Sequence, residues 1–217
     1  MAQIEAPEFD ETNNEDENEV EVLNSRVLLR DVVRDLKLYV EYRDVQPVIK
    51  PLVYGSEPLT VDLEPARLDS MDRQLLAGKG SSITMRLTRE DGWYVVRGQL
   101  LPGEQPFAKK FKTLPTSFRT DYGVLTFRAH GTEKMTDNQE YEIQIMPPFM
   151  VSTRYLGAMK IEPANKQTSV ALLTVRDENY QRGMDFLRYV SLCYNRQANA
   201  DKNEIALRTE EFINDRM

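Results

Sequence analysis

The sequence predicts an α+β protein, with a mixed sheet flanked by helices and an antiparallel β-sandwich insert of jelly-roll type. Apolar residues recur at helical spacing near both ends of the chain, whereas short alternating runs separated by Gly, Pro, Asp and Asn fill residues 46–147. Residues 19–45 and 148–217 are therefore expected to form an α/β frame around the all-β insert. Residues 1–18 are polar and acidic, which is typical of a flexible tether.

Composition sets the broad class of protein. The 217 residues are 41% apolar, enough for a sizeable core, and no run approaches the roughly 20 apolar residues that cross a bilayer. The formal charge is −7, but residues 1–21 hold nine of the 35 acids and no base, so the remainder is nearly neutral. A nucleic-acid partner is not expected, because its electrostatic footprint needs clustered Lys and Arg with interleaved aromatics.

The first part of the frame is predicted to be a helix followed by a strand. The helix is expected from about Glu19 to Asp35 or Lys37, because these apolar residues recur at helical spacing: Val20, Leu23, Val27, Leu28, Val32, Val33 and Leu36. Leu38, Val40 and Tyr42 then alternate with charged or polar neighbours, which is the period of a strand.

The insert is predicted to consist of short strands with one helical turn near Ser70–Leu76. Gly92 and Gly123 stand in turns where a positive φ is expected. The expected strands are Lys50–Tyr54, Leu59–Leu63, Ser82–Arg89, Gly92–Leu100, Ala108–Thr113, Gly123–His130 and Glu140–Met146.

The second part of the frame begins with a short helix, expected over Pro148–Met159 with prolines in its first turn. Strands are expected at Lys160–Pro163 and Ser169–Arg176. Two amphipathic helices should follow, one around Phe186–Tyr194 and one over 205–217. The apolar stripe of the second still includes the last residue, with no Gly, Asn or Pro stop signal, so this helix is expected to be the truncated base of a longer one.

Few residues support catalysis or ligand binding. His130 is the only histidine, which excludes a His-rich metal site and any arrangement that needs a second imidazole. Cys193 is the only cysteine, and its apolar helix face predicts a buried structural thiol. The run Ala77–Ser82 lacks the first Gly and the Ser or Thr of a phosphate loop. We therefore expect no catalytic residue, no cofactor and no metal.

Trp93 and Tyr94 allow two interpretations. They are neighbours on a predicted strand, and aromatic faces can stack on the CH faces of sugar rings, which would make the insert a carbohydrate-binding or adhesion module. Alternate positions on a sandwich strand also point into the core, so packing in the core is the other interpretation.

Seven segments, in this order along the chain, carry a family pattern: Leu23–Arg26, Leu36–Tyr42, Val53–Leu59, Arg182–Leu187, Tyr194–Asn195, Asp201–Asn203 and Thr209–Met217. They resemble the periplasmic domain of Wzz-type chain-length determinants, the polysaccharide co-polymerases. The form they resemble is fused to the bacterial tyrosine kinases of capsule and exopolysaccharide assembly in Bacteroides-like bacteria. The resemblance covers about residues 19–217 and is weakest inside the insert.

The resemblance implies a domain at the periplasmic face of the inner membrane, set between two transmembrane helices, that packs into homo-oligomeric rings and controls polysaccharide chain length. It implies a polysaccharide polymerase, an outer-membrane exporter and polysaccharide itself as partners. The kinase domain would lie beyond the second membrane helix, so this chain is expected to be soluble and not an enzyme. The expected ring contacts are Leu23, Val27, Arg30, Arg34, Arg182 and Tyr189.

Overall fold

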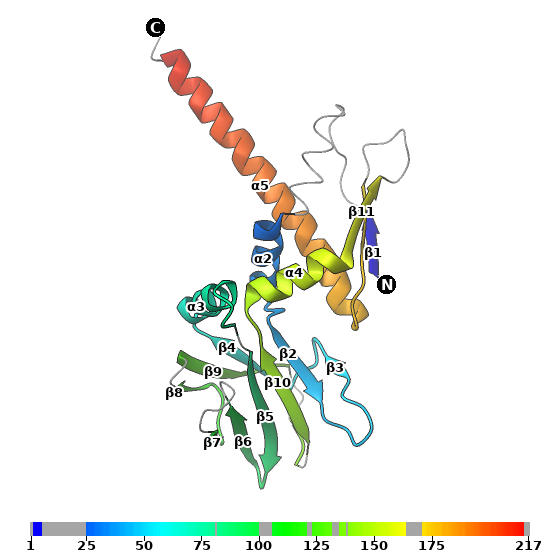
Figure 1. The fold of residues 1–217 in the computed structure, drawn as a ribbon, viewed down its shortest axis with the longest axis vertical. Helices are drawn as coiled ribbons and strands as arrows, with labels where there is room; N and C mark the ends of the chain where they lie inside the picture. Colours follow the sequence, from blue (N-terminus) through cyan, green and yellow to red (C-terminus); the bar gives the residue numbers. More distant parts are fainter. Residues whose placement is uncertain are drawn as a thin grey trace. The chain divides into compact units, whose positions relative to one another are not determined.

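The computed structural model describes residues 2–5, 25–80, 82–99, 106–120, 123–131, 135–137, 139–163 and 171–214. These residues form an α+β fold with four helices, and every strand pair described is antiparallel (Figure 1). The chain divides into two compact units. Unit 1 comprises residues 1–36 and 155–217, and unit 2 comprises residues 37–154.

Unit 2 contains two sheets and the helix α3 (Pro65–Leu76). The six-stranded sheet has the order β3 (Leu52–Val53), β2 (Val40–Asp44), β10 (Glu140–Ile145), β5 (Ile83–Glu90), β6 (Trp93–Gln99) and β7 (Phe107–Phe111). The three-stranded sheet has the order β4 (Leu59–Leu63), β9 (Gly123–Ala129) and β8 (Thr116–Thr120). The helix α4 (Pro148–Ala158) begins in unit 2 and ends in unit 1.

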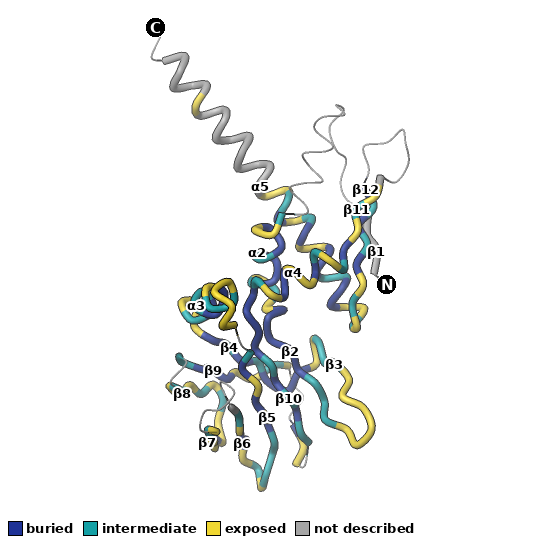
Figure 2. The backbone as a smooth tube through the Cα atoms, viewed as in Figure 1, coloured by how far each residue is buried: buried dark blue, intermediate teal, exposed yellow. Residues whose placement is uncertain are grey.

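The core of unit 2 joins the apolar faces of its two sheets. Buried and more exposed side chains alternate along β4 and β5, as expected of half-buried strands (Figure 2). The ring of Phe111 on β7 lies 5.3 Å from that of Phe127 on β9, and Phe127 stacks at 5.3 Å on Phe118 of β8. Tyr94 of β6 stacks on Phe111 at 5.4 Å. Each such ring pair adds about 0.5–1.5 kcal/mol beyond the area it buries.

Tyr42 also links the two sheets. It stands on β2 opposite Ile143 of β10 and is buried. Its hydroxyl accepts a hydrogen bond of 2.8 Å from the backbone N–H of Val61, on the edge strand β4. Burial raises the pKa of the Tyr42 hydroxyl well above its usual range. The hydroxyl therefore satisfies an edge donor that would otherwise be buried without a partner.

Unit 1 contains a three-stranded sheet in the order β1 (Ala2–Glu5), β12 (Ala171–Val175) and β11 (Met159–Pro163). The helix α2 (Arg26–Asp35) packs against the long helix α5 (Tyr180–Asn214). The Ser25 hydroxyl caps α2 by accepting from the Val27 N–H. The buried apolar side chains described on the two helices are Leu28, Leu29, Val32 and Val33 on α2, and Phe186, Leu187, Val190 and Cys193 on α5.

Most of the predicted elements are present. The strand β4 has the predicted ends, and β5, β6, β9, β10 and α4 differ from prediction by a single residue at one or both ends. The helix α3 begins at Pro65, five residues before the predicted turn, because Pro65 supplies a favourable first helical position. The strand β8 was not predicted, since Phe118 is its only large apolar residue.

The mixed sheet was a wrong prediction for the described residues, because all of their strand pairs are antiparallel. The strand β2 had been assigned to the frame, yet it pairs with β10 and β3 inside unit 2. Val40 and Tyr42 explain this, since they stand opposite Ile145 and Ile143 on the buried face of the six-stranded sheet. The predicted division into frame and insert therefore remains a prediction, with boundaries that differ from those of the two units.

Two further differences concern the chain ends. Residues 2–5 of the predicted tether form β1, which pairs with β12, while the rest of residues 1–18 lies outside the described residues. The two helices predicted after Asp177 are one continuous helix, α5. The polar stretch between Tyr194 and Glu204 contains no Gly or Pro, so nothing in it interrupts the helical hydrogen bonds.

Candidate interaction surfaces

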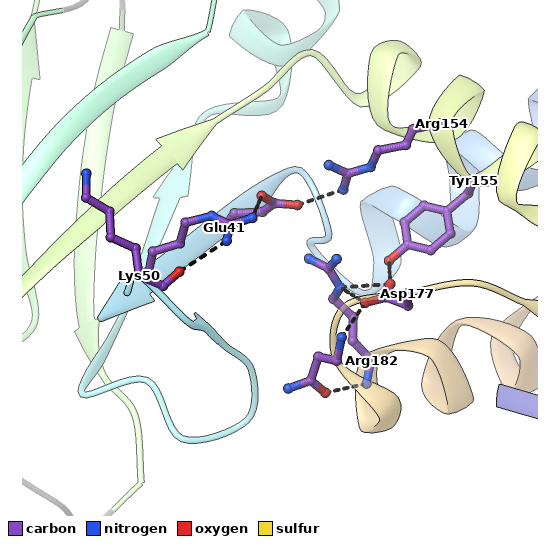
Figure 3. A network of polar contacts seen from close by, with 8 residues as sticks. Glu41, Lys50, Arg154, Tyr155, Asp177 and Arg182 are labelled. Atoms are coloured by element: carbon purple, nitrogen blue, oxygen red, sulfur yellow. Dashed lines mark hydrogen bonds and ion pairs between the residues drawn. The ribbon is translucent and has the colours of Figure 1, made fainter. Parts of the chain in front are cut away.

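A buried ion pair fixes the start of α5 in unit 1. The Arg182 Nε donates to both carboxylate oxygens of Asp177 at 2.9 Å, and the two side chains are only 7% and 3% exposed. The Tyr155 hydroxyl, from the end of α4, donates to Asp177 Oδ2 at 2.6 Å (Figure 3). The Tyr155 ring also stacks on Phe186 of α5 at 4.1 Å. This Asp177 cluster joins α4, the loop before α5 and α5 itself.

The backbone before α5 is arranged to build that cluster. The Asn179 Oδ1 accepts from the Arg182 N–H at 3.0 Å, which is an N-cap hydrogen bond to the third helical residue. The Asn179 N–H donates to Asp177 Oδ1 at 2.8 Å. Asp177 therefore receives hydrogen bonds from a backbone amide, a phenol and a guanidinium. Arg182, predicted as a ring contact, lies inside unit 1 and does not contribute to its surface.

The helices α2 and α5 also carry exposed apolar residues outside their buried faces. On α5, Tyr189 and Leu192 are 36% and 60% exposed and stand one helical turn apart. On α2, Val27 is 54% exposed. We call Tyr189 and Leu192 the α5 patch, and Val27 the α2 patch. These exposed side chains are the apolar residues of α2 and α5 that we consider for contact with a partner.

Charged residues accompany both patches. Arg30 and Arg34, one and two turns after Val27 on α2, are partly buried. Arg196 of α5 lies 3.7 Å from Asp35 of α2. Leu23, the remaining predicted ring contact, lies outside the described residues.

The predicted buried thiol is confirmed. Cys193 is free and 4% exposed on the inner face of α5. Burial raises the pKa of the Cys193 thiol. A protonated, covered thiol is a poor nucleophile, so Cys193 serves packing.

Trp93 and Tyr94 differ in exposure, so one fits sugar stacking and the other fits packing in the core. Tyr94 is 6% exposed and stacks in the core of unit 2 on Phe111, so it is a packing residue. Trp93 is 41% exposed at the start of β6, and the Lys112 ammonium lies 5.6 Å from its ring centroid. Only Trp93 therefore remains a candidate for stacking against a sugar.

Unit 2 also carries an exposed apolar hairpin tip and a buried carboxylate network. Val48 and Ile49, between β2 and β3, are 92% and 59% exposed.

In the same unit, the buried Glu41 carboxylate accepts a hydrogen bond from Arg154 at 2.7 Å (Figure 3). Arg43 lies 3.6 Å from Glu41. This network anchors the first part of α4 to β2.

The other candidates from the sequence have ordinary structural positions. The N–H of Gly78 and that of Lys79 donate to the carbonyls of Leu75 and Gln74, so they close the end of α3 and are not directed at a phosphate. His130 follows β9, with its Nε2 3.7 Å from a carboxylate oxygen of the buried Glu57.

Neither a scan against protein-family models nor a search of curated proteins finds a match to this chain. Within the described residues, His, Cys, Asp and Glu do not gather in a group of three that could hold a metal ion. None of the described helices is both long and apolar enough to cross a membrane.

Two groups of functional interest were missed from the sequence. The Asp177 cluster could have been anticipated in part, because Asn179 just before an apolar helical stripe is an N-cap signal. The pairing of Lys110 and Lys112 with Trp93 depends on the register of β6 and β7, which a short strand does not specify from sequence alone.

Proposed function

We propose that this chain is a non-catalytic scaffold and oligomerisation domain of a Wzz-type chain-length determinant, of the form fused to a bacterial tyrosine kinase. It would act at the periplasmic face of the inner membrane in capsule or exopolysaccharide assembly. The ordered family segments of the sequence support this proposal. The two facing sheets of unit 2 are consistent with a β-sandwich insert of jelly-roll type.

The exposed apolar residues of α2 and α5 are the observation that carries the proposal. Both helices bury other apolar residues in unit 1, whereas Val27, Tyr189 and Leu192 remain exposed outside that core. An apolar side chain on each of two neighbouring helices gives one copy two different contact surfaces. A contact between the α2 patch of one copy and the α5 patch of the next is heterologous, and such contacts form a ring when the rotation closes.

Tethering to a membrane explains how patches this small could suffice. Each comprises one or two side chains, far less than a stable soluble interface needs. Copies held on one membrane surface meet at a high effective concentration, so weak contacts become occupied. The copies would then present a fixed array to the polymerase and the exporter, with no chemistry performed by the domain.

Disulfide trapping on vesicles tests this arrangement. Two proteins are prepared in a Cys193→Ser background, one with Val27→Cys and one with Leu192→Cys, and both are bound through histidine tags to nickel-chelating vesicles. A heterologous contact predicts that mild oxidation cross-links the mixture but neither protein alone. Lys79→Cys, at an exposed turn of unit 2, replaces either partner as the control and should not cross-link.

Two outcomes of that experiment would contradict the ring. Efficient cross-linking of each protein with itself would indicate an isologous dimer, and no cross-linking above the Lys79→Cys control would remove the contact altogether. In cells of the source bacterium, Leu192→Asp should shift the length distribution of surface polysaccharide on gels, while the protein level remains unchanged.

A second candidate function is carbohydrate binding by unit 2, and the exposure of Trp93 favours it. An indole 41% exposed on a sheet is available for stacking, whereas Tyr94 is buried and drops out of this proposal. Saturable change of Trp93 fluorescence with oligosaccharide would support it. Because Trp93 is the only tryptophan, that signal reports on this site alone.

A further inference from the structure

One edge of unit 2 is basic although the whole chain is acidic. The described residues 93–99 and 106–120, which form β6, β7 and β8, contain five Lys or Arg and no Asp or Glu. The formal charge of the whole chain is −7. This basic edge therefore differs in sign from the net charge of the chain. Its strands lie far in the sequence from the acidic residues 1–21.

The register of the sheet gathers part of this charge around Trp93. Trp93, Val95 and Arg97 alternate along one face of β6. Lys110 of β7 pairs with Val95, so it stands on that same face, diagonal to Trp93 and to Arg97. Lys112 follows β7 and lies over the Trp93 ring at 5.6 Å. We call Trp93, Arg97, Lys110 and Lys112 the Trp93 platform.

A carboxylate completes the platform. Glu90 pairs with Trp93 across the β5–β6 hairpin and accepts from both terminal nitrogens of Arg97, at 2.7 and 3.3 Å. The Thr88 hydroxyl donates to Glu90 at 2.9 Å. These hydrogen bonds, those from Arg97 first, lower the pKa of Glu90 to about 2. The Trp93 ring thus lies between the Glu90 carboxylate of β5 on one side and Lys110 and Lys112 on the other.

Protection of a sheet edge explains only part of this arrangement. Lysines on an edge strand such as β7 discourage pairing with another chain, and that role needs no aromatic residue. A large indole held in water, on the same face as the lysines, contributes little to such protection. A ligand with an apolar face and a negative charge would use both features.

We propose that the Trp93 platform binds an anionic glycan, with a sugar ring stacked on Trp93 and its carboxylate bound by Lys110 and Lys112. This inference rests on the second proposed function, carbohydrate binding, and adds the class of sugar. A uronate polymer has hydroxyl groups between its charges, which can donate to the ionised Glu90. DNA has no comparable series of hydroxyl donors along its phosphates, so its backbone would give Glu90 no hydrogen bonds.

Fluorescence titration of the full chain provides the test. Oligogalacturonate serves as the anionic probe, maltooligosaccharide of the same length as the neutral probe, and oligothymidylate as a polyanion without sugar carboxylates. We expect saturable quenching or enhancement of Trp93 with oligogalacturonate, and affinity at least about tenfold lower for maltooligosaccharide, since one charge-assisted hydrogen bond is worth about that factor. Binding should also weaken as salt is raised.

Variants separate the aromatic from the ionic contribution. Lys110→Gln with Lys112→Gln should lower the affinity for oligogalacturonate about tenfold and reduce its salt dependence. Trp93→Ala, followed by calorimetry, should abolish binding while the circular dichroism spectrum is retained. Lys79→Gln removes an exposed lysine of the same unit outside the platform and should leave the affinity unchanged.

The outcomes distinguish the preference for an anionic glycan from carbohydrate binding itself. Equal binding of the neutral and anionic oligosaccharides would overturn the preference for an anionic glycan and leave carbohydrate binding standing. If neither oligogalacturonate nor maltooligosaccharide bound, both the preference for an anionic glycan and carbohydrate binding by unit 2 would be overturned. Binding of oligothymidylate as tight as that of oligogalacturonate, or binding that survives Trp93→Ala, would reduce the platform to a non-specific cationic surface and overturn the inference.

Discussion

Replacing Asp177 by Asn should destabilise unit 1 strongly. The substitution keeps the shape of the side chain but removes its charge, which breaks the buried ion pair with Arg182, whose side chain is 7% exposed. Breaking a buried ion pair from one side costs about 3–5 kcal/mol. With an m value of about 2 kcal/mol/M in urea for a unit of this size, the unfolding midpoint of unit 1 should fall by about 2 M.

The chain contains a separate probe for each unit. Cys193, the only cysteine, is buried in unit 1, so its reaction with Ellman's reagent reports the opening of that unit. Trp93, the only tryptophan, reports on unit 2 through its fluorescence. Urea titrations of the wild type and of Asp177→Asn, followed by both signals, therefore assign the loss of stability to a unit.

A control in the first turns of α5 sharpens this prediction. Asp185→Asn makes the same chemical change, but Asp185 is 26% exposed and its partner Arg188, 3.7 Å away, is 61% exposed. Exposed ion pairs contribute about 0–1 kcal/mol, so this variant should hardly shift the thiol transition. If Asp177→Asn shifted that transition by no more than Asp185→Asn does, the reasoning about the buried cluster would be refuted.

Three further predictions concern unit 2, and urea unfolding followed by tryptophan fluorescence measures the first two. Tyr42→Phe should cost about 1–3 kcal/mol, because it leaves the N–H of Val61 buried without an acceptor; an unchanged midpoint would contradict the link between the sheets. Gly123→Ala should cost about 1–3 kcal/mol, because a φ of +112° is strained for any residue with a Cβ; a neutral result would show that the turn relaxes. The lowered pKa of Glu90 means that its pairing with Arg97 stabilises fully above the usual carboxyl range and is lost as the pH falls towards 2. Carboxyl NMR titration should show Glu90 ionising near pH 2, and at a higher pH in Arg97→Gln, where the hydrogen bond from Thr88 remains; the same titration midpoint in both proteins would rule out Arg97 as the cause.

Local patterns were sufficient for most of the elements, since each element depends largely on nearby residues. The strand β4 has the predicted ends because Leu59, Val61 and Leu63 alternate without interruption. The strand β8 was missed because one Phe in a polar run gives no alternation. Pairing partners were harder to predict, since the sequence of β2 fits a strand of the predicted frame as well as a strand of the predicted insert. Its position in unit 2 depends on cross-strand contacts with β10, far away in the sequence.

In the candidate surfaces, too, positions set by a local pattern were predictable, and positions set by contacts with other segments were not. The apolar stripe of α5 correctly indicated Phe186, Val190 and Cys193 as inward-facing residues. Arg182, in contrast, was expected to be a ring contact from the family resemblance, whereas it is buried against Asp177 of the preceding loop. The lysines around Trp93 could not be placed on its face until the β6–β7 register was known.

The Asp177 cluster has a further role if α5 provides the contact between copies. If the register of α5 shifted by one residue, each of its side chains would turn by about 100° around the helix axis. Such a shift would carry Leu192 away from its exposed position. The ion pair to Arg182 and the Asn179 cap fix that rotation at the first turn, and the stacking of Tyr155 on Phe186 fixes it one turn later. Weakening the cluster should therefore weaken association between copies, although the Asp177 side chain is buried inside unit 1.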